Sequence, residues 1–492
     1  MSATELVPAK RFYWFALAVL LLMLLGTAFR LVSLPHESFG GDELFTRRAV
    51  LLPLPQSYAM VRDDMTHPPL HYLLLKFITP VLGTGEFGFR ALSLFCGIAT
   101  IGLIAMLGSR LPGARWCGLL AASIMAVSRF PIYYSQESRS FALYTFLVTL
   151  LALWVHAISR HPHQRRLWLS GLCIMTLLLY THWYSSLFIT SAVLALLISS
   201  VPTRTKLLAV ATAAGSALLF IPWILAILSI YRSNTLNDQL NWYGHPTLWD
   251  LKKLWAASLG IMDFHGAITA TLVLILLLAA AALVLVSRKE TLRNHPTVVA
   301  LAIMAILPPL IVFILSVPPF NHTLFGLRHF LPSMAALLLL CCFGLERLSQ
   351  ASRHQGTLVA LSGAALLLAI ATIPTIQAMR AGPFRFPFDR LAQKVQSAQS
   401  AGTPAYVVKF YKEGEPLNYY CHSLCTQPLP TSDAQLPARL MLIYQPLSPN
   451  EASRYRQLIQ EGYIDQGHLL YTNGYGNDDT WGTIAATLQR PK

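Results

Sequence analysis

The chain has few charged residues for its length. Of its 492 residues only 12% are Asp, Glu, Lys or Arg, whereas 54% are hydrophobic. Ordinary soluble domains carry about 25% charged residues, so this composition excludes a soluble protein. With a mean hydropathy of +0.51, the chain is predicted to be a polytopic α-helical membrane protein.

Acidic residues are particularly scarce. There are 22 Asp and Glu residues against 37 Lys and Arg, giving a formal net charge of +15. A basic protein can bind nucleic acid, but here the basic residues recur between apolar segments and do not form one patch. That distribution is typical of loops held on the cytoplasmic side of a membrane. We therefore expect contact with membrane lipids and no nucleic-acid partner.

Cysteine is scarce, with seven in the chain, and no cleavable leader is expected. All cysteines except Cys421 and Cys425 lie in apolar segments, where they act as small hydrophobic residues. If the tail is extracytoplasmic, Cys421 and Cys425 can form a disulfide closing a small loop; a metal site is less expected, because only His422 accompanies them. The apolar segment from Phe12 to about Leu34 is too long for a signal-peptide core and is expected to remain as the first span.

Long apolar runs are what the chain has in abundance. Runs of about 17–25 residues predict about eleven transmembrane helices. They centre near residues 12–34, 89–108, 116–134, 140–158, 167–183, 185–200, 207–230, 267–286, 297–317, 331–346 and 357–377. The segment His71 to Gly83 is too short to span and contains Lys76, so an interfacial or re-entrant helix is predicted there.

Basic residues alternate between successive loops. With a cytoplasmic N-terminus, the inner loops carry Arg110 and Arg115; Arg160, Arg165 and Arg166; Arg204 and Lys206; Arg288, Lys289 and Arg293; Arg347 and Arg353. The short loops between them carry little beyond Arg139 and Arg328. The positive-inside rule then predicts a multi-pass protein of the cytoplasmic (inner) membrane, with the N-terminus cytoplasmic and the C-terminus extracytoplasmic.

Two domains are expected. Residues 1–380 form the transmembrane domain, whose first outer loop, 35–88, is predicted to contain short helices at Glu43 to Leu52 and Gln56 to Met65. Residues 381–492 are polar and predict a small extracytoplasmic α/β domain. Its expected elements are helices at Phe388 to Ala401 and Asn450 to Glu461, strands at Ala405 to Tyr411 and Leu440 to Tyr444, and further strands within 463–488.

Another outer loop, at about 231–266, is rich in aromatic residues. It contains Asn241, Trp242, Tyr243, Trp249 and Trp255. An interfacial aromatic belt explains most of this composition. A surface that contacts a sugar or a lipid is the alternative.

The stretch Ser38-Phe39-Gly40-Gly41-Asp42-Glu43 follows the first span directly. Two carboxylates near the membrane surface favour a functional site, because ionisable groups there are costly to desolvate. The alternative is a helix N-terminus, with the glycine pair as the turn and the acids stabilised by the helix dipole.

A possible divalent-metal site follows in the same loop. Asp63, Asp64, His67 and His71 offer oxygen and imidazole ligands, but their spacing matches no specific metal motif. We therefore favour a His67 that caps its helix and solvated carboxylates, and no cofactor is firmly predicted.

Two arginines stand at outer turns. One turn is Tyr133-Tyr134-Ser135-Gln136-Glu137-Ser138-Arg139, and the other is Phe325-Gly326-Leu327-Arg328-His329-Phe330-Leu331-Pro332. Glu137 and Arg139 can form a structural ion pair. A guanidinium at the headgroup level is equally suited to hold a phosphate. A carboxylate base with a phosphate clamp suits transfer from a lipid-phosphate donor to a hydroxyl or amine.

These motifs, in this order and on this side, resemble the GT-C glycosyltransferases. The similarity is to the bacterial protein-O-mannosyltransferase-like and aminoarabinose-transferase-like enzymes and covers residues 10–380. It implies a polyprenyl-phosphate-sugar donor, an inverting displacement and an outer-leaflet site. Asp42 matches the catalytic acidic position, with Glu43 beside it, and His67, Glu137, Arg139 and Arg328 match positions lining the donor or acceptor cavity.

Two departures from this pattern concern specificity. His71 stands where the family often has Tyr, and His329 follows Arg328 where Tyr is common. Both leave the sugar and the acceptor open. The sequence thus predicts a membrane glycosyltransferase acting on an acceptor glycan, lipid or protein. A transporter or flippase of lipid-linked saccharides is the alternative; it should show mid-span charges and repeats with interrupted helices.

Overall fold

The computed structural model describes most of the chain, in two compact units. The described residues are 3–34, 37–231, 245–258, 292–320, 324–351, 355–381, 387–408, 414–430, 436–444, 449–471 and 483–490. One unit comprises Met1–Leu31, Ala49–Gly83 and Gly88–Thr375, and the other comprises Val32–Arg48, Thr84–Phe87 and Ile376–Lys492. The predicted span 267–286 and most of the aromatic loop 231–266 lie outside the described residues.

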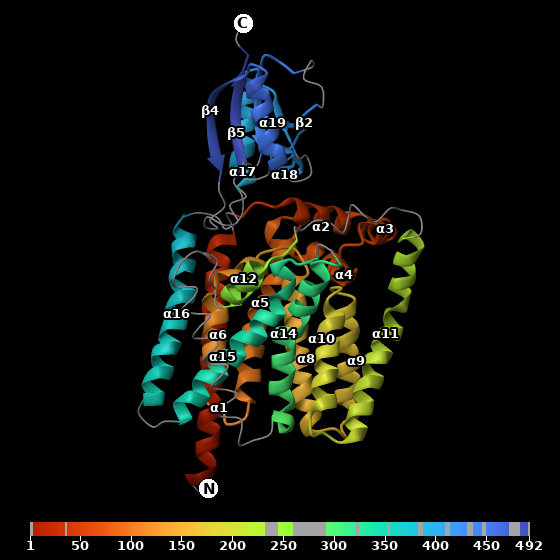
Figure 1. The fold of residues 1–492 in the computed structure, drawn as a ribbon, viewed down its shortest axis with the longest axis vertical. Coiled ribbons are helices and arrows are strands. Elements are labelled where there is room, and N and C mark those ends of the chain that lie inside the picture. The colour runs from red at the N-terminus through yellow and green to blue at the C-terminus, as the bar shows by residue number, and fades with distance from the viewer. Residues whose placement is uncertain are drawn as a thin grey trace. The chain divides into compact units, whose positions relative to one another are not determined.

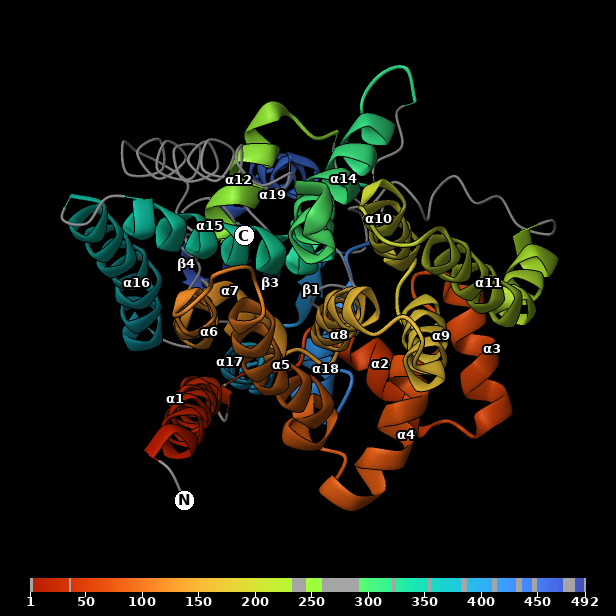
Figure 2. The same cartoon turned by 90° about the horizontal axis from the view of Figure 1, so that it is seen from below.

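The first unit is helical, and its elements follow the predicted order closely (Figure 1). Its helices are α1 (Ala3–Ser33), α3 (Leu54–Asp64), α4 (Leu70–Leu82), α5 (Glu86–Ser109), α6 (Cys117–Val127), α7 (Arg129–Ser135), α8 (Phe141–Arg160), α9 (Arg165–Leu179), α10 (Ser185–Ile198), α11 (Thr203–Tyr231), α12 (Leu248–Ser258), α14 (Pro296–Ser316), α15 (Leu331–Ala351) and α16 (Gln355–Ala381), with short 3₁₀ turns η3 (Leu292–Asn294) and η4 (Leu327–Phe330). Helix α14 packs against α10 and α15, and α9 packs against α8 and α11 (Figure 2).

Seven helices of the described residues are long and apolar enough to cross a membrane. An eighth span is present if α6 and α7, which are bent by 63° at their junction, count as one. Helices α9 and α10 fill the predicted spans 167–183 and 185–200 but have only 15 and 14 residues. At about 1.5 Å per residue they are shorter than a hydrocarbon core of about 30 Å. The polytopic helical class is confirmed, and the total of about eleven spans stays a prediction.

Arg30 satisfies the polar groups that the bend between α6 and α7 exposes. It is fully buried. Its guanidinium donates to the carbonyl oxygens of Ala126 at 3.1 Å and Met125 at 3.3 Å, in the last turn of α6, and to Ser135 Oγ at 3.0 Å. A cation at a helix C-terminus is favoured by the helix dipole. The guanidinium thereby holds α1, α6 and α7 together.

Glu346 of α15 accepts hydrogen bonds from backbone N–H groups at the start of α6. Its buried carboxylate accepts from the backbone N–H groups of Arg115, of Trp116 at 3.1 Å and of Cys117 at 2.8 Å. These are donors that a helix start leaves without intrahelical partners. Arg30 and Glu346 thus both bind backbone groups, one at each end of α6.

The short helices predicted between the first and second spans are present. Helix α2 (Gly41–Leu51) begins near the glycine pair, and α3 begins after Pro53 and ends at Met65 in the left-handed conformation. Helix α4 has 13 residues and is apolar, as expected for a segment too short to span. Lys76 of α4 donates to the carbonyl oxygens of Val50 at 2.7 Å and of Leu52.

The second unit contains a five-stranded mixed sheet in the order β2-β1-β3-β5-β4. Its strands are β1 (Ala405–Val407), β2 (Gln427–Pro428), β3 (Arg439–Tyr444), β4 (Ile464–Tyr471) and β5 (Thr483–Gln489), and its helices include α17 (Phe388–Ser400), α18 (Glu415–Tyr420) and α19 (Pro449–Gln460). Strands β2, β1 and β3 are parallel, and β5 is antiparallel to β3 and β4. The small C-terminal α/β domain is therefore confirmed.

Two apolar clusters stabilise this unit. One includes Leu391 and Val395 of α17 with Val407 and Ile443, and the other includes Leu440, Leu442 and Leu458. Because successive residues of a strand point to opposite faces, β3 contributes Met441 and Ile443 to the first cluster and Leu440 and Leu442 to the second. The disulfide Cys421–Cys425 is formed beside the first cluster, as expected.

The second unit also includes the segment that carries the paired acids. Ser38 Oγ donates to Asp389 Oδ1 of α17 at 2.8 Å, and the backbone N–H of Phe39 donates to Tyr420 Oη at 2.6 Å. Tyr420 in turn donates to Glu86 Oε1 at 2.9 Å. These bonds explain why 32–48 and 84–87 group with residues beyond 375. The predicted division into 1–380 and 381–492 stays a prediction.

Candidate active site

Asp42 and Glu43 lie in the first turn of α2, where their environments differ. The backbone N–H of Glu43 donates to the Gly40 carbonyl at 3.0 Å, and Glu43 Oε2 accepts from the backbone N–H of Gly40 at 3.3 Å. This reciprocal contact is one half of a capping box. Glu43 is fully buried, whereas Asp42 is partly exposed. The helix start predicted as an alternative is therefore present, and Glu43 is the residue that fixes it.

His67 does not cap a helix, so that part of the prediction is wrong. The N-cap of α4 is Pro69, which makes no side-chain cap bond. His67 is instead 2% exposed, and its Nδ1 lies 3.1 Å from Nη2 of Arg139. Its Nε2 is buried and has no hydrogen-bond partner among the residues that the structure describes. The buried imidazole of His67 therefore lies in a different environment from the aspartates of α3.

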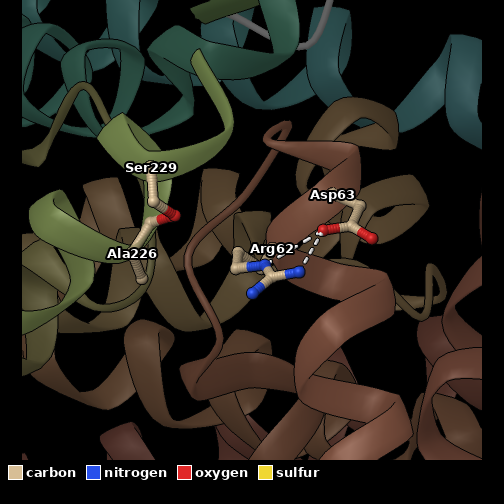
Figure 3. A network of polar contacts seen from close by, with 4 residues as sticks. All are labelled: Arg62, Asp63, Ala226 and Ser229. Carbon is tan, nitrogen blue, oxygen red and sulfur yellow. Dashed lines mark hydrogen bonds and ion pairs between the residues drawn. The ribbon is translucent and has the colours of Figure 1, made fainter. Parts of the chain in front are cut away.

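The carboxylates of that loop face a different environment. Asp63 Oδ1 accepts from Nε and Nη2 of the adjacent Arg62 at 3.0 and 2.9 Å, on an exposed part of α3 (Figure 3). Figure 3 shows Ala226 and Ser229 of α11 nearby. Within the described ranges, no three His, Cys, Asp or Glu side chains are placed to hold a metal ion. The grouping of Asp63, Asp64, His67 and His71 around a metal therefore gains no support.

Arg139 is buried and held by both its backbone and its side chain. Its carbonyl accepts from Ser93 Oγ at 3.2 Å, and its N–H donates to the Glu137 carbonyl at 2.8 Å. Besides the contact with His67, Nη1 lies 3.4 Å from Tyr72 Oη. The side chain of Glu137 is also buried. The tight turn after α7 thus presents the guanidinium toward α4.

The anchoring of this turn leads back to α1. Gln136 Nε2 donates to the Arg30 carbonyl at 2.6 Å, while the Arg30 guanidinium donates to Ser135 Oγ. An ideal Cβ built on Gly97 of α5 would lie 2.0 Å from Ser135 Oγ. Only glycine permits this approach of α5 to α7.

The second predicted arginine reaches the same ring as His67. Arg328 lies in η4, and its guanidinium carbon is 5.4 Å from the ring centre of Phe141, the first residue of α8. His67 and His329 lie 5.7 Å from that ring centre. The structure therefore brings two of the predicted donor-site residues, His67 and Arg328, together around Phe141, and the third, Arg139, contacts His67. We call these residues, with His182 and His329, the Phe141 cluster.

His182 is the member of the Phe141 cluster that the sequence analysis missed. It lies between α9 and α10, is 3% exposed, and its Nε2 is 3.0 Å from Nδ1 of His329. Its ring stacks on Tyr144 with centres 4.6 Å apart and planes 10° apart. The signal was a polar run, Tyr180 to Tyr184, at the predicted outer turn between two spans. By itself that run indicates only the boundary between two spans.

Hydrogen bonds made by neighbouring residues hold His182 near His67. The Leu70 N–H donates to the Tyr180 carbonyl at 2.9 Å, and Trp183 Nε1 donates to the Met65 carbonyl at 3.0 Å. The segment before α4 and the turn before α10 are therefore joined on both sides of His67. The two imidazole rings lie 5.2 Å apart.

The histidines of the first outer loop are kept neutral by their surroundings. Burial, assisted by the positive charge of Arg139, holds the pKa of His67 well below its usual range. The same causes lower the pKa of His71 to about 3. Desolvation penalises the charged form of an imidazole, so the local positive charge at neutral pH comes from the arginines.

Comparisons with known proteins agree with the predicted resemblance. Residues 66–226 match the family described as dolichyl-phosphate-mannose-protein mannosyltransferase. No curated protein sequence matches the chain. The matched region includes His67, Arg139 and His182.

Solved structures extend the likeness over nearly the whole chain. ArnT from Cupriavidus metallidurans in the apo state matches with a TM-score of 0.57 and 13% identity over 97% of this chain and 98% of that one. ArnT bound to undecaprenyl phosphate matches with 0.55, at 13% identity over 96% and 98%.

The archaeal oligosaccharyltransferase AglB from Archaeoglobus fulgidus, solved with an inhibitory peptide and a dolichol-phosphate, matches with 0.52 and 12% identity over 85% of this chain. The chain spans 64% of AglB's length. The resemblance to GT-C glycosyltransferases is therefore confirmed at the level of the fold.

Proposed function

We propose that the protein is a membrane glycosyltransferase that moves a sugar from a polyprenyl-phosphate donor to an acceptor glycan, lipid or protein. The observation that carries this proposal is the Phe141 cluster, in which the Arg328 guanidinium and three imidazoles lie around one phenyl ring and the Arg139 guanidinium contacts one of those imidazoles, that of His67. Planar guanidiniums match the oxygens of a phosphate group. The lipid phosphates bound to ArnT and AglB support the same class of donor.

The reaction breaks one bond and forms one. The acceptor oxygen or nitrogen attacks the anomeric carbon, whose bond to the phosphate oxygen breaks, so that polyprenyl phosphate leaves with the bonding electrons. Arg139 and Arg328 stabilise the charge that develops on that phosphate. A carboxylate takes the proton of the acceptor. Attack from the face opposite the leaving group inverts the anomeric centre.

Asp42 is the base in this scheme. Glu43 is buried and its carboxylate accepts from the Gly40 N–H, which ties it to the helix start. Asp42 is partly exposed beside it, and the preceding Gly41 allows close approach to a substrate. His67 and Glu137 complete the proposed set, with His67 as a hydrogen-bond donor and Glu137 as part of the turn that presents Arg139. No divalent metal is needed in this scheme.

The proposed location of the reaction is the outer face of the cytoplasmic membrane. Support comes from the alternation of basic loops, which puts Asp42, Arg139 and Arg328 on the extracytoplasmic side. The Cys421–Cys425 disulfide supports an oxidising compartment for the C-terminal unit.

A transporter of lipid-linked saccharides is the alternative function. Buried charges inside the spans would favour it, but Arg30 and Glu346 bind backbone groups at the ends of α6. Their use is structural, which favours the enzyme.

The test is to incubate the purified protein with a panel of polyprenyl-phosphate sugars and to measure release of polyprenyl phosphate. Release that depends on Arg139 and on one sugar supports the proposal. Movement of labelled donor between the leaflets of vesicles, without release of polyprenyl phosphate from any donor, would support the transporter.

A further inference from the structure

His182 makes two hydrogen bonds whose directions can be assigned. Its Nδ1 lies 3.1 Å from the backbone nitrogen of Tyr184, and its Nε2 lies 3.0 Å from Nδ1 of His329. A backbone N–H can only donate, so Nδ1 of His182 accepts. An imidazole with one accepting nitrogen is neutral and carries its proton on the other. His182 therefore donates from Nε2 to His329.

The tautomer of His329 follows from that bond. Because Nδ1 of His329 accepts from His182, His329 is also neutral and carries its proton on Nε2. The stacking of His182 on Tyr144, at 4.6 Å and 10°, holds the donating ring in place. Tyr184 further packs on the His329 ring, with centres 5.1 Å apart.

His67 has the same tautomer for a separate reason. Its Nδ1 faces Nη2 of Arg139 at 3.1 Å, and a guanidinium has donors only. His67 therefore accepts at Nδ1 and carries its proton on Nε2. That N–H is buried and has no hydrogen-bond partner in the described part of the chain, which is costly unless a ligand accepts from it.

We propose that His182 is a positioning residue: it fixes His329 as a neutral Nε2–H donor, so that His329 and His67 present matched donors beside Arg139 and Arg328. This inference rests on the proposed function, because the group that accepts from these donors is the phosphate of the lipid-linked sugar. The arginines supply the positive charge. The two imidazoles are neutral and supply hydrogen-bond donors whose positions are fixed by their tautomers.

Two substitutions separate the roles of the His182 ring. His182→Phe keeps an aromatic ring on Tyr144 but removes the donor to His329. His182→Gln loses the stack but places an amide N–H near the position of Nε2. The matched control is His156→Phe, because His156 of α8 also makes a histidine contact between helices, with Thr297 at 3.2 Å, and lies outside the cluster.

The first measurement is the tautomer itself. Long-range proton–nitrogen NMR of the ¹⁵N-histidine-labelled protein in phosphatidylcholine nanodiscs distinguishes protonated from unprotonated ring nitrogens, with His329→Gln used to assign the His329 signals. We expect an unprotonated Nδ1 and a protonated Nε2 on His329 in the parent and in His182→Gln. In His182→Phe the preference should be lost. A His329 protonated on Nδ1 in the parent would overturn the proposal.

The second measurement is the affinity for undecaprenyl phosphate in the same nanodiscs. Loss of one buried hydrogen bond corresponds to about a tenfold change, so His182→Phe should weaken binding about tenfold. His182→Gln should recover most of it, and His156→Phe should match the parent. Equal affinity for His182→Phe and the parent would refute the positioning role.

The two proposals fail in different ways. If the parent does not bind undecaprenyl phosphate at all, the proposed donor class fails, while the NMR result still decides whether His182 sets the tautomer of His329. If His182→Phe does not fold, as judged by thermal unfolding, the parent's spectrum and the affinity of His182→Gln relative to His156→Phe decide the question. An affinity of His182→Gln more than tenfold below that control would then contradict the proposal.

Discussion

At the scale of single residues, the two arginines of the Phe141 cluster carry the proposed donor recognition. Arg139 is buried and bonded to His67, and Arg328 lies over Phe141. Changing either to Ala should weaken donor binding by about 1.5–3 kcal/mol, the scale of a charge-assisted hydrogen bond. Arg→Lys should restore only part, because the planar fork is lost. The measurement is donor affinity for the four variants, and unchanged affinity in both Ala variants would reduce the arginines to structural roles.

The buried histidines predict how stability depends on pH. His71 has a folded-state pKa of about 3, against an ordinary value of 6.5, so the unfolded chain binds more protons between these pH values. The contribution of His71 to stability is therefore present above about pH 6.5 and is lost as pH falls below it. His67 acts in the same direction. The positive charge of Arg139 contributes to both shifts.

The change to test this is His71→Tyr. The parent's unfolding temperature should fall between pH 7 and pH 5. The fall should be smaller in His71→Tyr, because this variant lacks a histidine that becomes protonated in the unfolded chain but stays neutral in the folded protein. Thermal unfolding in detergent at the two pH values measures this. Equal falls in both proteins would show that His71 does not contribute to the linkage.

The sequence predicted some of these residues and missed others. Arg139 and Arg328 were found because an isolated arginine in a loop otherwise poor in basic residues is conspicuous. His182 was missed, because its partner His329 is 147 positions away in the chain and no local spacing encodes such a contact. The assignment of His67 as a helix cap was wrong because Pro68 and Pro69 suit a helix start regardless of what the preceding side chain binds.

At the scale of helices, the bend between α6 and α7 determines where Arg139 stands. Arg30 donates to the last carbonyls of α6, and its own carbonyl accepts from Gln136, three residues before Arg139. Arg30→Met should leave those α6 carbonyls buried without their partner and cost about 1–3 kcal/mol of stability. It should also lower donor affinity, because the turn loses its anchor.

The matched control is Arg110→Met. Arg110 also donates to a helix carbonyl, that of Met106 at 3.0 Å, but it is exposed. Its loss should leave unfolding and donor affinity close to the parent's. If Arg30→Met and Arg110→Met unfold alike, the bend does not depend on Arg30.

Most helices were predictable from hydrophobic runs, but the bend was not. The run 116–134 is mostly apolar, with Arg129 and Pro131 near its end, and it predicted one span where the structure has α6 and α7 at 63°. Arg30, about a hundred residues upstream, donates to the α6 carbonyls at this bend, and no local pattern indicates that contact. Runs 167–183 and 185–200 were predicted as spans because apolar composition does not show where a helix ends; α9 and α10 are shorter.

At the scale of the whole molecule, the proposed orientation rests on basic residues in alternating loops. A reporter that is active only outside the cytoplasm should be active when fused after Lys492 and inactive when fused in the loop containing Arg165 and Arg166. The physical reason is that Lys and Arg near span ends are retained on the cytoplasmic side. Activity of a strictly cytoplasmic reporter after Lys492 would overturn the orientation and the proposed location of the reaction.

The membrane-protein class is predictable from composition, because a chain with so few charged residues has few soluble alternatives. The α/β nature of the C-terminal unit was also visible in its alternating and amphipathic segments. What the sequence did not show is that Val32–Arg48 groups with that unit. The contacts responsible, such as Ser38 with Asp389, join residues 351 positions apart.

The central claim is that Asp42 is the base of a sugar transfer. Asp42→Asn keeps the shape of the side chain but removes its basic oxygen, so transfer should fall by about 10²-fold or more. Donor binding should persist, because the proposal assigns the phosphate to the arginines and not to Asp42. Glu43→Gln should cost less, since an amide oxygen can still accept from the Gly40 N–H.

The deciding measurement is the transfer rate and the donor affinity of Asp42→Asn and Glu43→Gln, determined side by side with the parent. We predict slow transfer with parent-like donor affinity for Asp42→Asn, and near-parent transfer for Glu43→Gln. Near-parent transfer by Asp42→Asn with an inactive Glu43→Gln would exchange the two roles. Near-parent transfer by both variants would contradict the assignment of a carboxylate base to this helix.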